Sequence, residues 1–151
     1  MTDQSLDRLA RFFATSPAAR KAVRPLGAGA RVALVLDEGP AGFTLREGAP
    51  HLAAGPLDDP DFTVRLPAAA VARVVAVEGD DVGAVGVAFF QLVFERTPPL
   101  RVGLTVDAPT GRLLAHGYLS VLALGGAKVA LWLLRRGLAN PRKVIERLRG
   151  R

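Results

Sequence analysis

Hydrophobic and polar positions follow two different periodicities along this chain of 151 residues. Apolar residues at helical spacing predict helices over residues 5–13, 68–77 and 82–94. Shorter apolar or alternating runs, bounded by glycine, proline and aspartate, predict strands at 31–36, 43–46, 51–54, 61–66 and 100–106. The first three strands are joined by tight turns, which indicates an antiparallel meander. The connection over residues 16–29 has room for a short helix at 17–23.

The fourth strand shows the alternation most clearly. Phe62, Val64 and Leu66 should point to one face of the sheet, while Thr63 and Arg65 point to the other. The order of elements is helix, strands, two helices, strand and further helices. This order predicts an α+β fold, in which a five-stranded antiparallel sheet carries its helices on one face.

The most apolar stretch covers residues 112–138 and is long enough to span a membrane. His116, Lys128 and the Gly125–Gly126 pair interrupt it, and a lysine inside a span is costly. We therefore predict two helices that meet near the glycine pair. A short basic helix is predicted at 142–149.

Charge is concentrated at one end of the chain. Residues 1–127 hold 12 basic and 13 acidic residues, whereas residues 128–151 hold eight basic residues and one acid. The net charge of +6 thus comes from the C-terminal segment. The length suits one domain over residues 1–151, with 128–151 as a basic helical extension.

Composition narrows the function classes. The chain has no cysteine and two histidines, which argues against disulfides, a thiolate or other metal site, and a cysteine nucleophile. It has no phosphate-binding loop and no recognised nucleic-acid motif, so we expect neither a cofactor nor a nucleic-acid partner. The first 13 residues do not resemble a secretory signal. Arginine, alanine, glycine and valine are abundant, which suggests a bacterial gene, and the absence of cysteine is compatible with the reducing cytoplasm.

Three passages together resemble the sterol carrier protein type-2 (sterol-binding) domain family. They are residues 61–66 (DFTVRL) with the helix 67–77; residues 89–91, continuing through Pro98–Pro99 to the strand 100–106; and the opening helix followed by RVALVL. The resemblance covers roughly residues 5–125. It implies a non-catalytic fold that encloses a sterol, fatty acid or acyl chain in an apolar tunnel between sheet and helices.

The helix at 82–94 supplies most candidate ligand contacts. Phe90 and Phe94 share one face, and Phe89 and Val93 share the next, so these faces either fill a core or line the tunnel. Gln91 is either exposed or turned toward a polar group of the ligand. The predicted ligand-binding residues are Phe89, Phe90, Gln91, Val93, Phe94, Leu104, His116, Leu119 and Leu122.

His116, close to Tyr118, has three interpretations: a structural histidine, a ligand contact, or, least favoured, a catalytic base. The C-terminal extension is a solvated basic face, an attachment to anionic lipid, where tryptophan and basic residues favour the interface, or, least favoured, a site for nucleic acid or an acidic protein. The predicted membrane contacts are Trp132, Arg135, Arg136, Arg142, Lys143 and Arg147.

Half of the residues are hydrophobic, which favours a lipid tunnel. The first hypothesis is therefore a carrier that binds a sterol-like, fatty acyl or isoprenoid lipid without catalysis and meets an anionic membrane, with a peripheral place at the inner membrane. The alternative is an accessory module that docks on a membrane-associated enzyme of lipid or quinone synthesis. A hydrolase or isomerase using His116 is least favoured, because few polar side chains are present.

Overall fold

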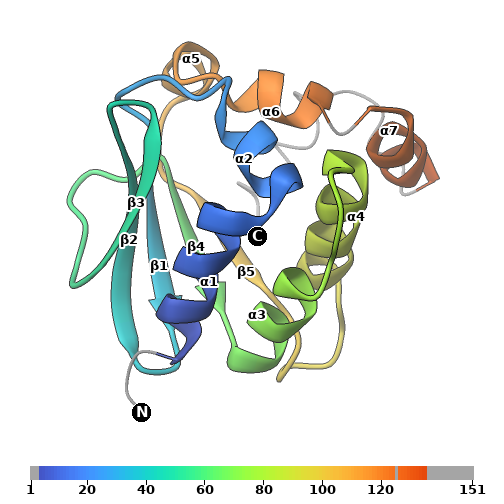
Figure 1. Ribbon diagram of the computed structural model, residues 1–151, viewed down its shortest axis with the longest axis horizontal. Coiled ribbons are helices and arrows are strands. Elements are labelled where there is room, and N and C mark those ends of the chain that lie inside the picture. Colours follow the sequence, from blue (N-terminus) through green and yellow to red (C-terminus); the bar gives the residue numbers. More distant parts are fainter. Residues whose placement is uncertain (1–3, 125, 136–151) are drawn as a thin grey trace.

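The computed structural model describes residues 4–124 and 126–135 (Figure 1). Its helices are α1 (Gln4–Thr15), α2 (Pro17–Val23), α3 (Ala68–Val75), α4 (Val82–Val93), α5 (Thr110–Ala115), α6 (Tyr118–Leu124) and α7 (Gly126–Arg135). Its strands are β1 (Arg31–Leu36), β2 (Gly39–Arg46), β3 (Ala49–Ala54), β4 (Phe62–Leu66) and β5 (Gly103–Val106). The α+β class and the five strands predicted from the sequence are confirmed.

The five strands form one mixed sheet in the order β3-β2-β1-β4-β5. The β1–β2, β2–β3 and β4–β5 pairs are antiparallel, so the predicted meander of the first three strands is confirmed. The prediction of a wholly antiparallel sheet is wrong at one pair, because β1 and β4 run parallel.

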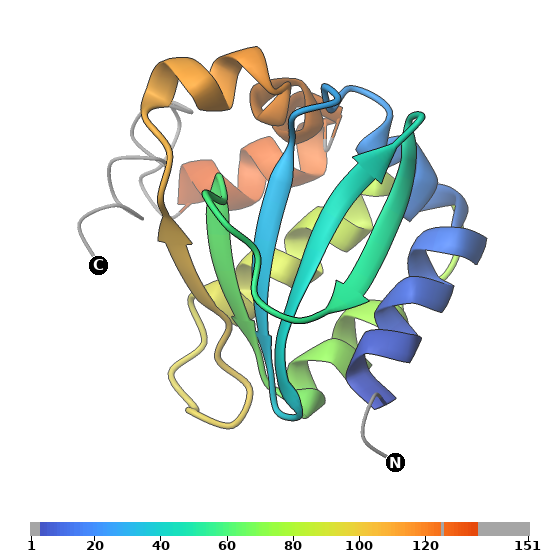
Figure 2. The same cartoon turned by 90° about the vertical axis from the view of Figure 1, so that its left-hand side faces the viewer.

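The parallel pair follows from the path of the chain after β3. Residues 55–61 cross the sheet and return to the end where β1 begins. Figure 2 shows this loop passing in front of the strands. The register Val32↔Phe62 then starts β4 beside the start of β1. The crossing loop packs on the sheet at Gly42, where a Cβ atom would lie 3.2 Å from Cβ of Leu57.

Helices α1 to α4 and α7 lie on one side of the sheet, and α5 and α6 run across its end (Figures 1 and 2). Phe62, Val64 and Leu66 face these helices, as the alternation predicts; Val64 and Leu66 belong to the buried core and Phe62 packs against it. Core residues from the helical side include Val71 of α3 and Val93 of α4, both fully buried.

Local signals explain where the central helices start. The side chain of Ser16 accepts a hydrogen bond from the amide of Ala19, with Pro17 at the first helical position of α2. Asp81 caps α4 in the same way by accepting from the amide of Ala84. These caps fix where α2 and α4 begin.

The apolar segment after residue 110 differs from the prediction. Its described part, residues 110–124 and 126–135, contains three helices rather than two, because the chain also turns at Gly117, whose φ is +87°. The predicted junction near Gly125 is confirmed, since α6 ends at Leu124 and α7 begins at Gly126. The basic helix predicted at 142–149 lies outside the described residues. Within the described part of the chain, no helix has the length and hydropathy to cross a membrane.

Candidate functional site: an apolar cavity beside a buried aspartate

A cavity of about 390 Å³ lies between the sheet and the helices. Its volume falls within the range of small-molecule binding pockets. Among the described residues that line it, Tyr118 alone has a polar side chain and none is charged. The lining residues are Leu9, Phe12, Phe13, Ala19, Ala22, Val23, Leu26, Val32, Leu34, Phe43, Leu52, Phe62, Val64, Leu66, Val74, Val82, Val85, Gly86, Phe89, Phe90, Leu104, Leu113, Tyr118, Val121 and Val129.

The sequence builds this cavity from two periodicities. Strand alternation turns every second residue of β1 and β4 toward the helices, and the nearly all-apolar helix α4 faces them. Gly86 lets α7 approach α4, because a Cβ atom there would lie 2.8 Å from Val129. The cavity is therefore bounded by α7 as well as by the predicted ligand-binding helix.

The predicted ligand residues divide into two groups. Phe89, Phe90 and Leu104 line the cavity. Val93 is fully buried in the core and does not line it. Gln91 is exposed on the outer face of α4, which leaves it without access to the cavity.

Phe94 and Trp132 pack on each other at the C-terminal end of α4. Their ring centroids are 5.7 Å apart, and Trp132 also stacks on Phe90 at 6.2 Å. The half-buried Trp132, predicted as a membrane contact, is thus turned onto α4. Among the other predicted membrane contacts, Arg135 is exposed. The described residues do not include four predicted membrane contacts, Arg136, Arg142, Lys143 and Arg147. The side chains of two predicted ligand contacts, Leu119 and Leu122, also lie outside what the structure describes.

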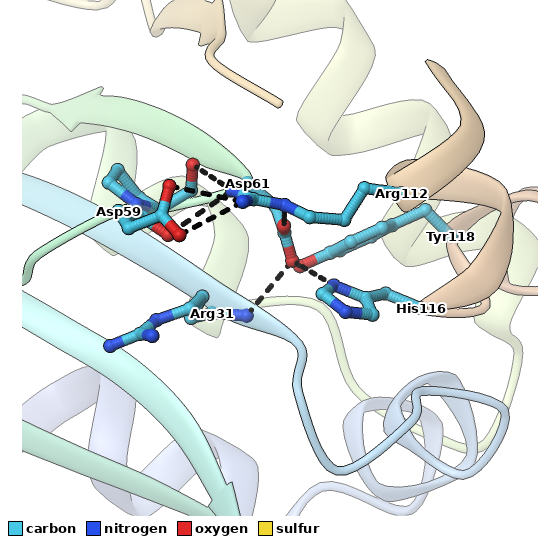
Figure 3. Close-up of polar contacts among 7 residues, drawn as sticks. Arg31, Asp59, Asp61, Arg112, His116 and Tyr118 are labelled. Atoms are coloured by element: carbon cyan, nitrogen blue, oxygen red, sulfur yellow. Dashed lines mark hydrogen bonds and ion pairs between the residues drawn. The ribbon is translucent and has the colours of Figure 1, made fainter. Parts of the chain in front are cut away.

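Asp61, the residue before β4, has a fully buried side chain at the end of the sheet (Figure 3). Three groups donate hydrogen bonds to its Oδ2: the amide of Arg31 at 3.2 Å, Nδ1 of His116 at 2.7 Å and the hydroxyl of Tyr118 at 2.8 Å. Nε of Arg112 donates to its Oδ1 at 2.8 Å. The carboxylate is therefore fully engaged, and we call these five residues the Asp61 cluster.

The backbone of Asp61 also makes hydrogen bonds that join separate parts of the fold. Its amide donates to the carbonyl of Arg31 at 2.8 Å, and its carbonyl accepts from the amides of Asp107 and Ala108 at 3.0 and 3.1 Å. One residue thereby links the starts of β1 and β4, the chain after β5, and helices α5 and α6. Because Leu113 and Val121 of these helices line the cavity, the Asp61 cluster holds one end of the cavity in place.

Arg112 connects the Asp61 cluster to the surface of the protein. Its Nη1 donates to both carboxylate oxygens of the exposed Asp59 at 3.0 Å. Its Nη2 donates to the carbonyls of Asp59 and Pro60 at 3.2 and 3.0 Å. The hydrogen bonds to Asp59 and Asp61 raise the pKa of Arg112 and keep it charged.

Protonation states follow from these contacts. Burial raises the pKa of Asp61, but the hydrogen bonds from His116, Tyr118, Arg31 and Arg112 outweigh burial and hold the pKa below its usual value. Asp61 is thus ionised, and Nδ1 of His116 carries the proton that it donates. Burial and the hydrogen bond to Asp61 raise the pKa of Tyr118 above its usual value, so its hydroxyl stays neutral.

His116, predicted as a ligand contact, is not among the residues that line the cavity. Its Nε2 lies toward Gly29, where a Cβ atom would be 2.8 Å from that nitrogen. In the described part of the chain, Asp61 is the hydrogen-bond partner of its side chain. The structure therefore places His116 in a cluster that joins elements of the fold.

Sequence reasoning missed the Asp61 cluster. It treated Asp61 as the first residue of a strand and noted that His116 lies near Tyr118, without connecting them. Fifty-five residues separate Asp61 from His116. No periodicity or motif marks such a pair, so the contact becomes visible only in the folded chain.

Tyr118 belongs to both the Asp61 cluster and the cavity. Its ring lines the cavity and packs edge-on against Phe62, with centroids 4.8 Å apart. Its hydroxyl donates to Asp61, which lies behind the wall. The ring of Tyr118 thus forms part of the cavity wall, while its hydroxyl group is held by Asp61.

Two other findings bear on the chemistry of the molecule. Over residues 4–124 and 126–135, no group of three or more histidine, aspartate or glutamate side chains is arranged to hold a metal ion. A second hollow between α1 and the end of α3 includes Arg8, Arg11 and Glu78 in its lining, which suits a hydrocarbon less well.

Comparisons of the chain with protein-family models, curated proteins and solved structures found no match.

Proposed function

We propose that this protein binds the hydrocarbon part of a lipid in the cavity between the sheet and the helices, without covalent chemistry. The observation that carries this proposal is the lining: 25 residues, none of them charged and 24 of them with no polar side-chain group. Burying apolar surface contributes about 25 cal/mol per Å². An enclosed hydrocarbon chain would therefore be bound without any specific polar contact.

The volume indicates what size of group fits. At about 390 Å³ the cavity lies near the lower end of the range of pockets that hold small molecules. This favours a single acyl or isoprenoid chain over a complete sterol.

The lining also determines where the polar end of the ligand lies. Tyr118 already donates its hydroxyl to Asp61, so the wall, as far as the described residues form it, offers no free polar side chain to a buried headgroup. An unpaired polar group in such a place is costly. The headgroup of the ligand therefore stays at the opening, and the protein selects its ligand by the hydrocarbon part.

The resemblance to the sterol carrier family supports the same proposal from the sequence. A carrier of this kind would take its ligand from a membrane and release it to another membrane or to an enzyme. Transfer requires no catalytic residue, because burial supplies the affinity.

The proposal is tested with the purified full chain. Native mass spectrometry and lipid extraction should reveal a bound lipid, and a fluorescent fatty acid should bind and be displaced by unlabelled fatty acid. Val85→Trp places an indole in the cavity and should weaken this binding while the protein stays folded.

Gln91→Trp is the matched control, since it adds the same side chain on the outer face of the same helix. It should bind the probe as the wild type does. A protein that carries no lipid and takes up neither fatty acid nor sterol would overturn the proposal. A stable protein complex that survives lipid removal would instead support the accessory module.

A further inference from the structure

Four large hydrophobic side chains are exposed in the described part of the chain, and all lie on three successive helices. Leu114 of α5 is 47% exposed, Leu124 of α6 is 45% exposed, and Leu131 and Leu134 of α7 are 53% and 56% exposed. A single exposed leucine needs no explanation, but a group of them marks an interaction site. Figure 1 shows α5, α6 and α7 along one end of the molecule.

The same helices form a wall of the cavity. Val121 of α6 and Val129 of α7 line the cavity, whereas Leu124 and Leu131 are exposed on those two helices. Each of these two helices thus carries an apolar residue on its inner side and another on its outer side. A surface that met these leucines would be separated from the cavity by one layer of helix.

Positive charge accompanies the leucines. Lys128, Leu131 and Arg135 follow one another at three- and four-residue spacing on α7, which places them on one face, and all three are exposed. Lys128 pairs with Asp81, the N-cap residue of α4, so its charge is partly compensated. The sequence after Arg135 adds six basic residues and one acid. Leucines beside basic residues are typical of helices that lie in the interface of an anionic bilayer.

We infer that Leu114, Leu124, Leu131 and Leu134 form a docking surface for a bilayer that contains anionic lipids. A second copy of the chain on these leucines would bring two copies of the basic helix α7 together, whereas an anionic bilayer neutralises its charge. This inference rests on the proposed function, because docking through the wall of the cavity gives a hydrocarbon chain a short path out of the membrane.

The test measures binding of the full chain to vesicles by co-sedimentation. Wild-type protein should bind vesicles of phosphatidylcholine with phosphatidylglycerol, and bind vesicles of phosphatidylcholine alone much more weakly. Leu131→Ser with Leu134→Ser should weaken binding about tenfold, the order expected for two half-exposed leucines withdrawn from an apolar phase. Raising the salt concentration should weaken wild-type binding further, because salt screens surface charge.

The matched control is Ala69→Ser with Ala72→Ser, two exposed positions on α3 that should leave vesicle binding unchanged. Circular dichroism and binding of a soluble fluorescent fatty acid show that each variant remains folded. These probes also separate the two proposals, since uptake of the free fatty acid tests the cavity without a membrane.

Three results would overturn the docking surface. They are absence of vesicle binding by the wild type, equal binding to neutral and anionic vesicles, and equal binding by the leucine and alanine variants. A wild-type dimer that becomes a monomer in the leucine variant would show that a second copy covers these leucines. Binding to anionic vesicles that the leucine variant loses selectively supports the inference even if no fatty acid enters the cavity.

Discussion

Replacing Asp61 by asparagine tests whether the buried carboxylate holds the end of the cavity together. The substitution keeps the shape of the side chain and removes its charge. With the amide oxygen in the place of Oδ2, asparagine still accepts from Arg31, His116 and Tyr118. Its NH₂ group then takes the place of Oδ1 and faces Nε–H of Arg112, so a donor meets a donor.

The cost of this change can be worked out from the contacts. One hydrogen bond to a charged group is lost, and such bonds contribute about 1.5–3 kcal/mol each. The three that remain become weaker, because their acceptor is now neutral. We therefore expect the free energy of unfolding to fall by about 2–4 kcal/mol, in line with the cost of breaking a buried ion pair. At roughly 2–4 °C for each kcal/mol in a protein of this size, the Tm should fall by about 4–16 °C.

Asp59→Asn is the control, because it removes a carboxylate from the same arginine at an exposed position. The side chain of Asp59 is 72% exposed, and surface ion pairs contribute about 0–1 kcal/mol. Its φ of +51° is one that asparagine adopts readily. Thermal and urea unfolding followed by circular dichroism give both free energies. Equal stability of the two variants would refute the assignment of Asp61 as the centre of the cluster.

The pH dependence supplies a second measurement on the same variant. The pKa of Asp61 is lower in the folded protein than the value of about 3.9 in an unfolded chain. Its stabilising contribution is therefore complete above that value and is lost as the pH falls through the folded pKa. Wild-type stability should fall more steeply than that of Asp61→Asn in this acidic window, and parallel curves would contradict the ionised, hydrogen-bonded carboxylate.

Three further predictions concern the walls of the site. Gly117→Ala should destabilise the protein by about 3 kcal/mol in urea unfolding, because its Cβ would lie 2.2 Å from the carbonyl oxygen of Pro25 at a φ of +87°. Gly29→Ala should displace the His116 ring, which would shift the imidazole resonances in NMR spectra and cost about 1–2 kcal/mol. Affinity for fatty acids, measured by displacement of a fluorescent probe, should rise by about 0.8 kcal/mol per methylene until the chain fills the cavity and should then level off. A steady rise to the longest chains would contradict a cavity of limited volume.

Periodicity was sufficient to predict the elements that face the core. The apolar run at 31–36 and the alternation at 61–66 correspond closely to β1 and β4, and the apolar segment at 82–94 corresponds to α4. The parallel pairing of β1 with β4 could not be predicted in this way. Alternation fixes which face of a strand is buried, whereas the direction of pairing depends on the path of residues 55–61 across the sheet.

The cavity was predictable in kind but not residue by residue. An apolar helix facing an apolar sheet pointed to Phe89, Phe90 and Leu104, which line the cavity; their contact with a ligand stays a prediction. The sequence could not show that Val93 would be enclosed by the core or that Gln91 would face outward, because α4 is apolar nearly all round and its rotation depends on its neighbours. The Asp61 cluster gave no local signal, since its members come from three separate parts of the chain.

Tyr118 connects the polar and apolar halves of the site physically. A tyrosine hydroxyl directed into an apolar cavity without a partner would hold water there, and a hydrocarbon ligand would have to displace that water. Here the hydroxyl donates to an ionised carboxylate behind the wall, whose other hydrogen bonds come from Arg31, Arg112 and His116. The cavity therefore stays apolar beside a buried charge, because residues outside its lining donate hydrogen bonds to both oxygens of the Asp61 carboxylate. On this reasoning, weakening the Asp61 cluster would lower both the stability of the fold and the affinity of the cavity for hydrocarbon.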